Sequence, residues 1–339
     1  MFPFSMSRFM ASLLARSRSC PVIAAFLLWA LGQDLPGAVT ITPANGDVWP
    51  PEVAQSEDGT ALDRDNILRF SLAGVQLKFS ALESASGGLT IPASGMGGDW
   101  IVKLPSREDT GVPENEFPMM HLASLLGLDV PDIGLIDIDN ISGLPEGMQR
   151  LGKTAFKIRR FDRQANGERV HMEDFAQVFS VYSDDKYKRA SMRNIASVIA
   201  SETNDRDIRE FIRRLVFNTL IGNGDMHLKN WSLIYPDKRN AALAPAYDFV
   251  STIAYIHGDS FALKYSRKRE FADLDFDELS HLAAKATLPE KMVIDTAREM
   301  TAEFLSHWAR EKKHLPMLEG VRTAIDELLP TLPLVTAVS

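Results

Sequence analysis

The sequence predicts an α+β fold with two lobes, in which a strand-rich first half precedes a helical second half. Three observations lead to this prediction. Short strand-like runs are joined by glycine clusters between residues 68 and 105, apolar residues recur at helical spacing after residue 173, and one hairpin interrupts the helical half. The chain of 339 residues is also long enough for two domains of ordinary size.

Composition narrows the class of protein. Apolar residues make up 45% and charged residues 24% of the chain, which is ordinary globular usage and excludes a disordered or fibrous protein. The net charge of −8 argues against a protein that grips nucleic acid alone, because neutralising phosphates requires a basic surplus. The single cysteine, Cys20, excludes an intramolecular disulfide and fits a reducing compartment.

Residues 1–62 are predicted to form an N-terminal segment and a linker, which precede the first lobe. Residues 1–19 carry three arginines and no acid, and an apolar run follows at 21–32. A run of this length is too short to cross a bilayer, which needs about 20 residues. It suits either a signal-peptide core or a short buried helix, and the lack of a clean cleavage site favours the helix.

The strand-rich lobe is predicted to span residues 63–162. Strand-like runs lie at 70–81, 89–93 and 99–105, and the glycine-rich turns between them indicate a meander. A helix is predicted over 114–126, although its Pro118 is tolerable only near a first turn. Two further strands are expected at 134–138 and 154–161.

The helical lobe is predicted to span residues 163–339. Apolar residues from Ile208 to Leu220 follow the i, i+3, i+4, i+7 pattern of one helix face, with Asn204 or Asp205 as the cap and Gly222 as the stop. Strand-like runs at 231–235 and 242–249 then form a hairpin around the turn PDKRN. Further helices are predicted at roughly 276–287, 289–312 and 317–329.

The hairpin carries the residues that indicate chemistry. Asp225 and Asn230 have the D-x-x-x-x-N spacing of a kinase catalytic loop, and Asp248 follows in AYDF, where a kinase places its main metal-binding aspartate. Val250 replaces the glycine of the kinase D-F-G motif. Phosphoryl transfer needs a carboxylate for the attacking hydroxyl and oxygen ligands for Mg²⁺. The combination therefore favours a metal site over a loop cap at Asp225 and a surface turn at Asp248.

His227 has two readings within the same loop. It could be a zinc ligand, but no second histidine or cysteine stands at ligand spacing. We therefore interpret it as a residue that orients the loop through hydrogen bonds.

The strand-rich lobe should then supply the nucleotide contacts. Lys103 lies between apolar neighbours in a strand, where kinases place their phosphate-binding lysine, and Glu116 is its expected partner, with Glu114 as the second choice. The alternative is an edge strand with a solvated Lys103. Residues 71–78 could arch over phosphates through backbone N–H groups, although the segment has one glycine where a kinase loop has three and could be an ordinary turn.

These motifs resemble the HipA family, the kinase toxins of bacterial toxin–antitoxin systems. The matching text includes FSLAGVQLK (70–78), IVKLP (101–105), RRFDR (159–163), HMEDFAQ (171–177), KY (186–187), GNGDMHLKNWSL (222–233) and LAPAYDF (243–249). The match runs over residues 68–330 in the same order. The resemblance implies a bilobal protein-kinase-like fold and a serine/threonine-protein kinase that acts as a toxin.

The resemblance also implies roles for individual residues. Asp225 resembles the catalytic base, Asn230 and Asp248 resemble Mg²⁺ ligands, and Ser71 stands at the autophosphorylated serine. The implied ATP contacts are the phosphate loop Ala73, Gly74, Val75, Gln76, Leu77 and Lys78; the pair Lys103 and Glu116; the adenine hinge Arg159, Arg160 and Phe161; the ribose contact Asp162; and His227, Lys229, Asn230, Tyr247 and Asp248. Arg159 departs from the glutamate that is frequent at the first hinge position.

By the same resemblance the cofactors are ATP and Mg²⁺, and the substrate is a protein hydroxyl, typically of an aminoacyl-tRNA synthetase. A helix-turn-helix antitoxin is the expected partner, so that DNA is contacted only indirectly, and the protein is expected in the cytoplasm, away from membranes. Residues 31–41 resemble only the last segment of the family's N-terminal subdomain, so that a separate small protein supplies the rest or the chain is truncated.

Two alternatives of other classes stay open. One is a small-molecule kinase of the aminoglycoside-phosphotransferase type, which shares the D-x-x-x-x-N motif. The other is a non-catalytic pseudokinase that serves as a co-repressor. The complete set of Asp225, Asn230, Asp248 and Lys103 argues against the pseudokinase.

Overall fold

The computed structural model describes residues 34–42, 76–84, 87–92, 97–106, 108–144, 147–182 and 185–338. The predictions for residues 1–33 and 43–75 lie outside these ranges. The chain divides into two compact units, which we call the sheet unit (Met1–Pro113 with Gly134–His171) and the helical unit (Glu114–Ile133 with Met172–Ser339). The domain boundaries expected after residues 62 and 162 stay predictions.

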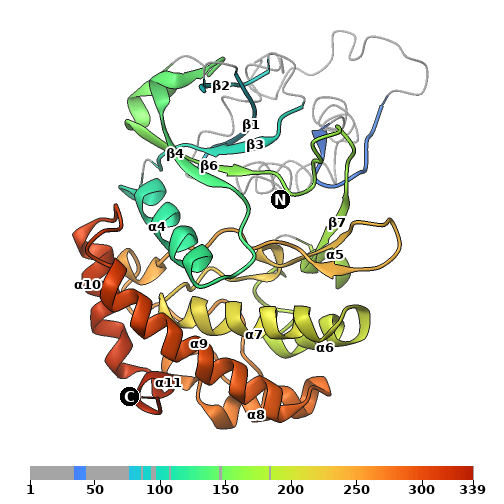
Figure 1. Ribbon diagram of the computed structural model, residues 1–339, viewed down its shortest axis with the longest axis vertical. Helices are drawn as coiled ribbons and strands as arrows, with labels where there is room; N and C mark the ends of the chain where they lie inside the picture. The colour runs from blue at the N-terminus through green and yellow to red at the C-terminus, as the bar shows by residue number, and fades with distance from the viewer. Residues whose placement is uncertain are drawn as a thin grey trace, which may run out of the picture. The chain divides into compact units, whose positions relative to one another are not determined.

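The sheet unit is built on six strands in the order β4-β6-β3-β1-β2-β5 (Figure 1). In chain order they are β1 Lys78–Glu83, β2 Leu89–Thr90, β3 Trp100–Lys103, β4 Ile133–Asp137, β5 Ile141–Ser142 and β6 Thr154–Arg159. β1 pairs antiparallel with β2 and with β3, and β3 pairs antiparallel with β6. β2 and β5 pair parallel.

The predicted meander is only half right. The tight turn at Ser84 joins β1 to β2 as a hairpin, with the Ser84 N–H donating to the oxygen of Gly88 at 2.8 Å. β3, however, pairs with the other edge of β1, because the free edge of β2 is taken by β5. This makes β3 a central strand flanked by β1 and β6. Its four residues are all buried.

Alternation along the strands produces the core of the sheet unit. Phe79 and Ala81 of β1 and Trp100 and Val102 of β3 point to the same side, since the side-chain period of a strand is two. They pack with apolar residues from the other strands and connections: Leu77, Leu89, Ile91, Leu104, Ile136, Ile138, Ile141, Met148 and Ala155. The sheet therefore has one continuous apolar face.

The helical unit contains most of the helices and a second, three-stranded sheet. The helices are α4 Val112–Leu125, α5 Phe175–Val178, α6 Met192–Glu202, α7 Asp205–Leu220, α8 Phe276–Ala286, α9 Glu290–Glu311, α10 Glu319–Leu328 and α11 Pro333–Thr336. The sheet order is β7-β8-β9, from β7 His171–Asp174, β8 Ser232–Tyr235 and β9 Ala242–Leu243. α7 packs along α9, and α8 packs against both α6 and α9 (Figure 1).

The helix predictions for this unit are confirmed to within about two residues at each end. α4 begins at Val112, so that Pro118 lies inside the helix rather than in its first turn as expected. The predicted strand at 242–249 is mostly wrong, because pairing stops at Leu243 and the chain continues as irregular backbone to Asp248. Within the described residues, no helix combines the length and the apolar character needed to cross a membrane.

Candidate active site

The loop with the kinase-like spacing begins where α7 ends. Asn204 caps the start of this helix by accepting two backbone N–H groups of the first turn, which satisfies donors that the helix leaves open. At the other end Gly222 has a φ of +64°, and a Cβ there would lie 2.5 Å from Ile253. Glycine alone meets both conditions. The chain therefore turns sharply and presents residues 223–230 as a loop.

Asn223 ties this loop to the segment that carries Asp248. Its buried amide nitrogen donates to Oδ1 of Asn218 on α7 at 2.8 Å and to the backbone oxygen of Asp248 at 3.2 Å. Its own Oδ1 accepts the N–H of Asp225 at 3.1 Å. One side chain thus links the helix, the predicted base and the predicted metal ligand. In the sequence Asn223 has only the appearance of a turn residue.

Asp248 adopts a backbone conformation that is uncommon for a residue with a side chain. Its φ is +58°, in the left-handed region. Such a residue costs free energy and persists where its surroundings determine it, which is typical of functional sites. The strand predicted through this position cannot form with that φ, and the carboxylate is half-buried in an irregular segment.

Asn115 of α4 fixes the residues that follow Asp248. Its side-chain nitrogen donates to the backbone oxygen of Ser251 at 2.9 Å, and its side-chain oxygen accepts the Ser251 N–H at 3.1 Å. Both residues are completely buried. The next residue of α4 is Glu116, whose side chain is also buried. Its pairing with Lys103 stays a prediction.

Asn230 has the environment expected of a metal ligand. Its amide nitrogen donates to the backbone oxygen of Asp225 at 2.7 Å, which fixes the side chain. Its Oδ1 is buried and accepts no hydrogen bond from the part of the chain that the structure describes, an arrangement that is costly unless something binds there. Asn230 and Asp248 offer oxygen atoms, the ligands that Mg²⁺ prefers. These residues fit the ion that the sequence predicts.

His227 orients the loop, as interpreted from the sequence. Its Nδ1 accepts the Lys229 N–H at 3.2 Å, so that its Nε2 carries the proton and lies 3.9 Å from Oδ1 of Asp225. Complete burial, together with the charge of Lys186, holds the pKa of His227 well below its usual value and keeps the ring neutral. Within the described chain, no three His, Cys, Asp or Glu residues converge as a metal group.

Tyr247 and Lys229 connect the two strands of the hairpin. The Tyr247 hydroxyl donates to the backbone oxygen of Lys229 at 3.1 Å and lies 2.5 Å from the Ser232 hydroxyl. Burial raises the pKa of Tyr247 well above its usual value, so the phenol stays protonated. Burial lowers the pKa of Lys229, against the opposing attraction of Asp174. The hairpin therefore brings residues 229–230 and 247–248 together.

The carboxylate of Asp225 reaches solvent. Its side chain is 47% exposed, and Oδ1 accepts the Tyr187 hydroxyl at 2.6 Å. A carboxylate that reaches solvent and accepts a hydrogen bond from a hydroxyl has the geometry of a group that orients an attacking hydroxyl. Tyr187 belongs to the KY motif, for which the sequence indicates no role.

In the sheet unit, Lys78 and Lys103 form a cross-strand pair. They are partners in the register of β1 and β3, so their side chains leave the same face of the sheet. Both are buried, and the Lys103 ammonium lies 5.5 Å from the centre of the Phe156 ring. The central place of β3 excludes the edge strand that was the alternative for Lys103. Two adjacent cations favour an anionic ligand such as a phosphate.

Only the end of the predicted phosphate loop lies within the described residues. The side-chain nitrogen of Gln76 is buried and makes no hydrogen bond in the described chain, so that it is a donor suited to a phosphate oxygen. Leu77 belongs to the core of the sheet unit, and its backbone oxygen accepts the Leu104 N–H at 2.8 Å. The expectations for Ser71, Ala73, Gly74 and Val75 lie outside the described residues.

The predicted adenine hinge contains a buried ion-pair network. Nε and Nη2 of Arg160 donate to the two oxygens of Asp162 at 3.0 and 2.8 Å, and Nη1 reaches Asp34 at 3.0 Å. Arg163 also pairs with both acids, at 2.9 Å each. The Gly37 N–H donates to Asp162 at 2.8 Å. We define these residues, with the segment 34–37, as the hinge network.

The hinge network bears on the predicted ribose contact of Asp162. Burial by itself would raise the pKa of Asp162, but the hydrogen bonds and charge of Arg160 hold it far below its usual value. Its carboxylate is thus committed to cations of the protein rather than open to a ribose. The Arg159 guanidinium lies 5.8 Å from the centre of the Trp100 ring, and the Phe161 side chain is half-buried. Their adenine role stays a prediction.

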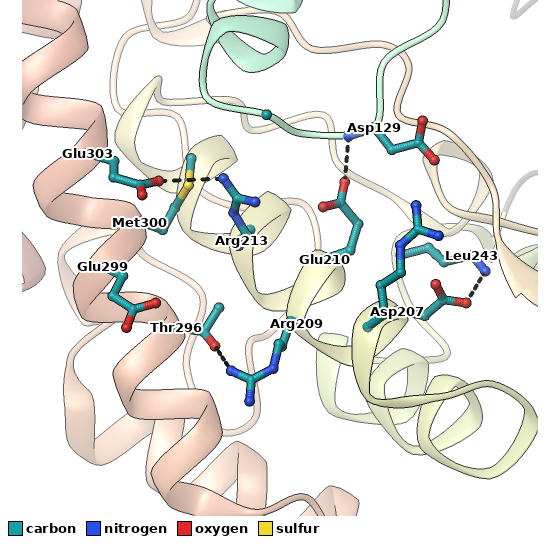
Figure 2. Close-up of a pocket in the computed structure, with 12 residues that line it drawn as sticks. Asp129, Asp207, Arg209, Glu210, Arg213, Leu243, Thr296, Glu299, Met300 and Glu303 are labelled. Atoms are coloured by element: carbon teal, nitrogen blue, oxygen red, sulfur yellow. Dashed lines mark hydrogen bonds and ion pairs between the residues drawn. The ribbon is translucent and has the colours of Figure 1, made fainter.

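A cavity of about 660 Å³ in the helical unit is separate from these residues (Figure 2). It lies along the first half of α7, α9 and the loop after α4, and the residues with kinase-like spacing do not line it. Its charged side chains pair largely with one another and with neighbouring polar groups: Arg213 lies 3.5 Å from Glu303, and Arg209 donates to Thr296 at 3.3 Å. We therefore do not assign it to the nucleotide.

The arrangement defines a class of protein. The fold is α+β, and Asp225 and Asn230 lie on the loop before a hairpin that Asp248 follows. Kinases place a catalytic aspartate and two metal-binding residues in this order. A family model, the HipA-like C-terminal domain, matches residues 70–308. The chain belongs to this family, and it is a kinase of the HipA type.

Individual relatives agree with this assignment. A protein of Sinorhizobium fredii named "Putative kinase Y4dM" is 58% identical over 311 residues, covering 91% of this chain and 75% of its own length. "Serine/threonine-protein kinase toxin HipA" of Shewanella oneidensis is 26% identical over 262 residues, covering 68% and 57%. A chain of the solved Shewanella oneidensis complex of HipA, HipB and operator DNA shares the fold, with a TM-score of 0.69 at 20% identity over 98% of this chain and 84% of that chain.

Proposed function

We propose that the chain is a serine/threonine-protein kinase that transfers the γ-phosphate of ATP to a protein hydroxyl. The observation that supports this most directly is the pair of Asp225 and Asn230 on the loop before β8. The carboxylate of Asp225 is accessible and accepts a hydrogen bond from a hydroxyl, while the buried Oδ1 of Asn230 has no hydrogen-bond partner among the described residues. The name of the HipA relative supports the serine/threonine specificity.

Each residue then has a definite task. Asp225 orients the attacking hydroxyl and receives its proton as the bond to phosphorus forms. Lys78, Lys103 and the amide of Gln76 bind the phosphates. Asn230 and Asp248 would hold Mg²⁺, which when bound neutralises charge on the phosphates. Neutral His227 keeps the loop in place without adding a positive charge beside Asp225.

The test is phosphate transfer from radiolabelled Mg-ATP by the purified chain to itself and to dephosphorylated casein. Asp225→Asn is expected to lose about 10²–10⁴-fold in rate, the usual contribution of one positioned acid–base group. Asp237→Asn is the matched control, because this exposed aspartate lies in the turn of the same hairpin. Full activity in Asp225→Asn, or equal loss in both variants, would contradict the assignment.

A toxin role follows as the biological part of the proposal. The HipA relative is named a toxin, and the solved complex that shares this fold contains HipB and operator DNA. A helix-turn-helix antitoxin is therefore the proposed partner, with an aminoacyl-tRNA synthetase as the proposed target. Expression of the chain alone should arrest growth, and Asp248→Ala should relieve the arrest. Arrest that persists in Asp248→Ala would separate toxicity from phosphotransfer.

Autophosphorylation at Ser71 is the proposed means of limiting the toxin. A phosphoserine adds about −1.5 to −2 charge. Next to a loop that must approach ATP phosphates, this charge would repel the nucleotide and lower activity. Peptide mapping after incubation with Mg-ATP should find one phosphate on Ser71 in the wild type and none in Asp225→Asn. A phosphate only at Ser80, or full activity of Ser71→Asp, would contradict this mechanism.

A further inference from the structure

The hydroxyl of Tyr187 occupies the side of Asp225 that a substrate hydroxyl needs. It donates to Oδ1 at 2.6 Å, within the 2.6–3.2 Å range in which a general base can take up a proton. A serine or threonine hydroxyl that is to be activated must donate to this carboxylate in the same way. The contact lies entirely within the helical unit.

We infer that Tyr187 controls which protein hydroxyls reach Asp225. Its phenol occupies the position at Asp225 that the hydroxyl of the phosphate acceptor needs, and the substrate must displace it. This inference rests on the proposed kinase function and names a feature of the same site. In the resting protein the phenol occupies Oδ1 of Asp225, so that a poorly fitting hydroxyl has to compete with it for this atom. A protein substrate engages Asp225 only if its own contacts compensate for the lost hydrogen bond.

The surroundings of the ring hold it in this position without burying it. The Tyr187 ring meets the His227 ring edge-on, with centroids 5.2 Å apart, and the Lys186 ammonium lies 4.8 Å from its centre. Lys186 is buried, whereas Tyr187 is 40% exposed. The Tyr187 ring thus packs on the neutral His227 ring and the Lys186 ammonium, and its exposed part is accessible to an incoming polypeptide.

The backbone around Tyr187 suits a residue that moves aside. It lies in an irregular turn before α6, held by the Lys188 N–H, which donates to the oxygen of Asp185 at 2.9 Å, and by an exposed ion pair between Arg189 and Asp185. No helix or strand has to unfold for the side chain to leave Asp225. Rotation about the side-chain bonds of an exposed tyrosine is fast compared with turnover.

Removal of the hydroxyl should therefore favour acceptor binding. Tyr187→Phe keeps the ring against His227 and Lys186 and removes the competing donor. We expect the KM for dephosphorylated casein to fall about threefold to tenfold, the size of an ordinary net hydrogen bond and below that of one to a buried charge, because Asp225 is half exposed and solvent screens it. The KM for ATP and the kcat should change less than twofold. The matched control is Tyr182→Phe, the same substitution at a position of the same segment where the tyrosine is 78% exposed.

The kinetic outcomes are decisive in either direction. A lower casein KM in Tyr187→Phe, with Tyr182→Phe at the wild-type value, supports the inference. An unchanged casein KM refutes it. A lower kcat in Tyr187→Phe also refutes it, since Tyr187 would then hold Asp225 in place rather than compete at it. Phosphotyrosine at Tyr187 in peptide maps refutes it as well, because the phenol would be an acceptor.

A second measurement tests the contact without relying on activity. In protein labelled with ¹³C at the tyrosine Cζ, Tyr187→Phe identifies the Tyr187 signal. That signal should shift in Asp225→Asn and on saturation with casein, while the Tyr182 signal stays unchanged. No shift in either case refutes the inference even if the kinase is active. If the shifts occur and no variant transfers phosphate, the proposed function fails, and the acceptor role fails with it.

Discussion

Replacement of Asp162 by asparagine separates a nucleotide contact from a structural ion pair. The family resemblance makes this residue a ribose contact, whereas in the structure its two oxygens accept four N–H groups, three from Arg160 and Arg163 and one from Gly37. Asp162→Asn keeps the shape of the side chain and removes its charge. The variant also turns an N–H₂ group toward a guanidinium.

The expected loss of stability follows from burial. The side chains of Arg160, Arg163, Asp34 and Asp162 are each 5–8% exposed, so solvent screens them little. Removing one member of a buried pair costs about 3–5 kcal/mol, because the remaining charge is left without compensation. Asp34 still faces both arginines and asparagine keeps one acceptor, which places the expected loss near the lower limit, about 3 kcal/mol. This corresponds to a reduction of about 150-fold in the folding equilibrium constant.

Urea unfolding followed by circular dichroism measures this loss, with Asp139→Asn as an exposed control in the sheet unit that should stay within about 0.5 kcal/mol of wild type. Because folding lowers the pKa of Asp162, its stabilisation is present above the unfolded-state value of about 4 and is lost as the pH falls further. The difference between wild type and variant should therefore narrow below pH about 4. An unchanged urea midpoint, combined with a raised KM for ATP, would refute the structural role and restore the ribose contact.

Three further predictions test other parts of the structure. Asn115→Ala should lower the unfolding free energy by about 2–3 kcal/mol and raise the KM for Mg-ATP, because two buried hydrogen bonds to Ser251 are lost; an unchanged KM would show that the segment after Asp248 is held by other contacts. Lys103→Ala should weaken ATP binding in a calorimetric titration, and Glu116→Ala should do so less; if only Glu114→Ala matters, the predicted pairing is wrong. Burial and the hydrogen bond to Glu173 raise the pKa of Tyr235 to about 12, so its contribution to stability is present below pH about 10 and is lost as the pH rises toward 12. Urea midpoints between pH 8 and pH 11 should fall more steeply for wild type than for Tyr235→Phe, and parallel curves would contradict this assignment.

The local parts of the fold could be predicted from the sequence because their signals are local. The apolar face of α7, the cap at Asn204 and the stop at Gly222 each depend on residues within one or two turns. The same holds for the spacing of Asp225 and Asn230 on one loop. The pairing of β3 with β1 is different, because it depends on which strand edge β5 occupies, and no short-range pattern records that competition.

The parts of the site that could not be predicted are contacts between distant residues. Asn115 and Ser251 are 136 positions apart, and Gly37 and Asp162 are 125 apart. Asparagine and aspartate at such positions have the same appearance as ordinary turn or surface residues. Tyr187 lies 38 positions before Asp225, in a motif that marks the family but does not reveal its chemistry.

The side chains that hold the catalytic loop explain how Asp248 keeps an unfavourable backbone. A φ of +58° costs an aspartate of order 1–3 kcal/mol, so the surrounding contacts must exceed that cost. The Asn223 side chain donates a hydrogen bond to the backbone oxygen of Asp248, and the Asn115 side chain forms hydrogen bonds with the backbone N–H and oxygen of Ser251. These bonds come from neutral, buried amides, which fix the backbone without adding a charge beside the proposed metal ligand Asp248. A cationic side chain in their place would pair with the carboxylates of Asp225 and Asp248 and compete with the hydroxyl and the Mg²⁺ that they are proposed to bind, so neutral amides suit a site that must leave its two acidic side chains available.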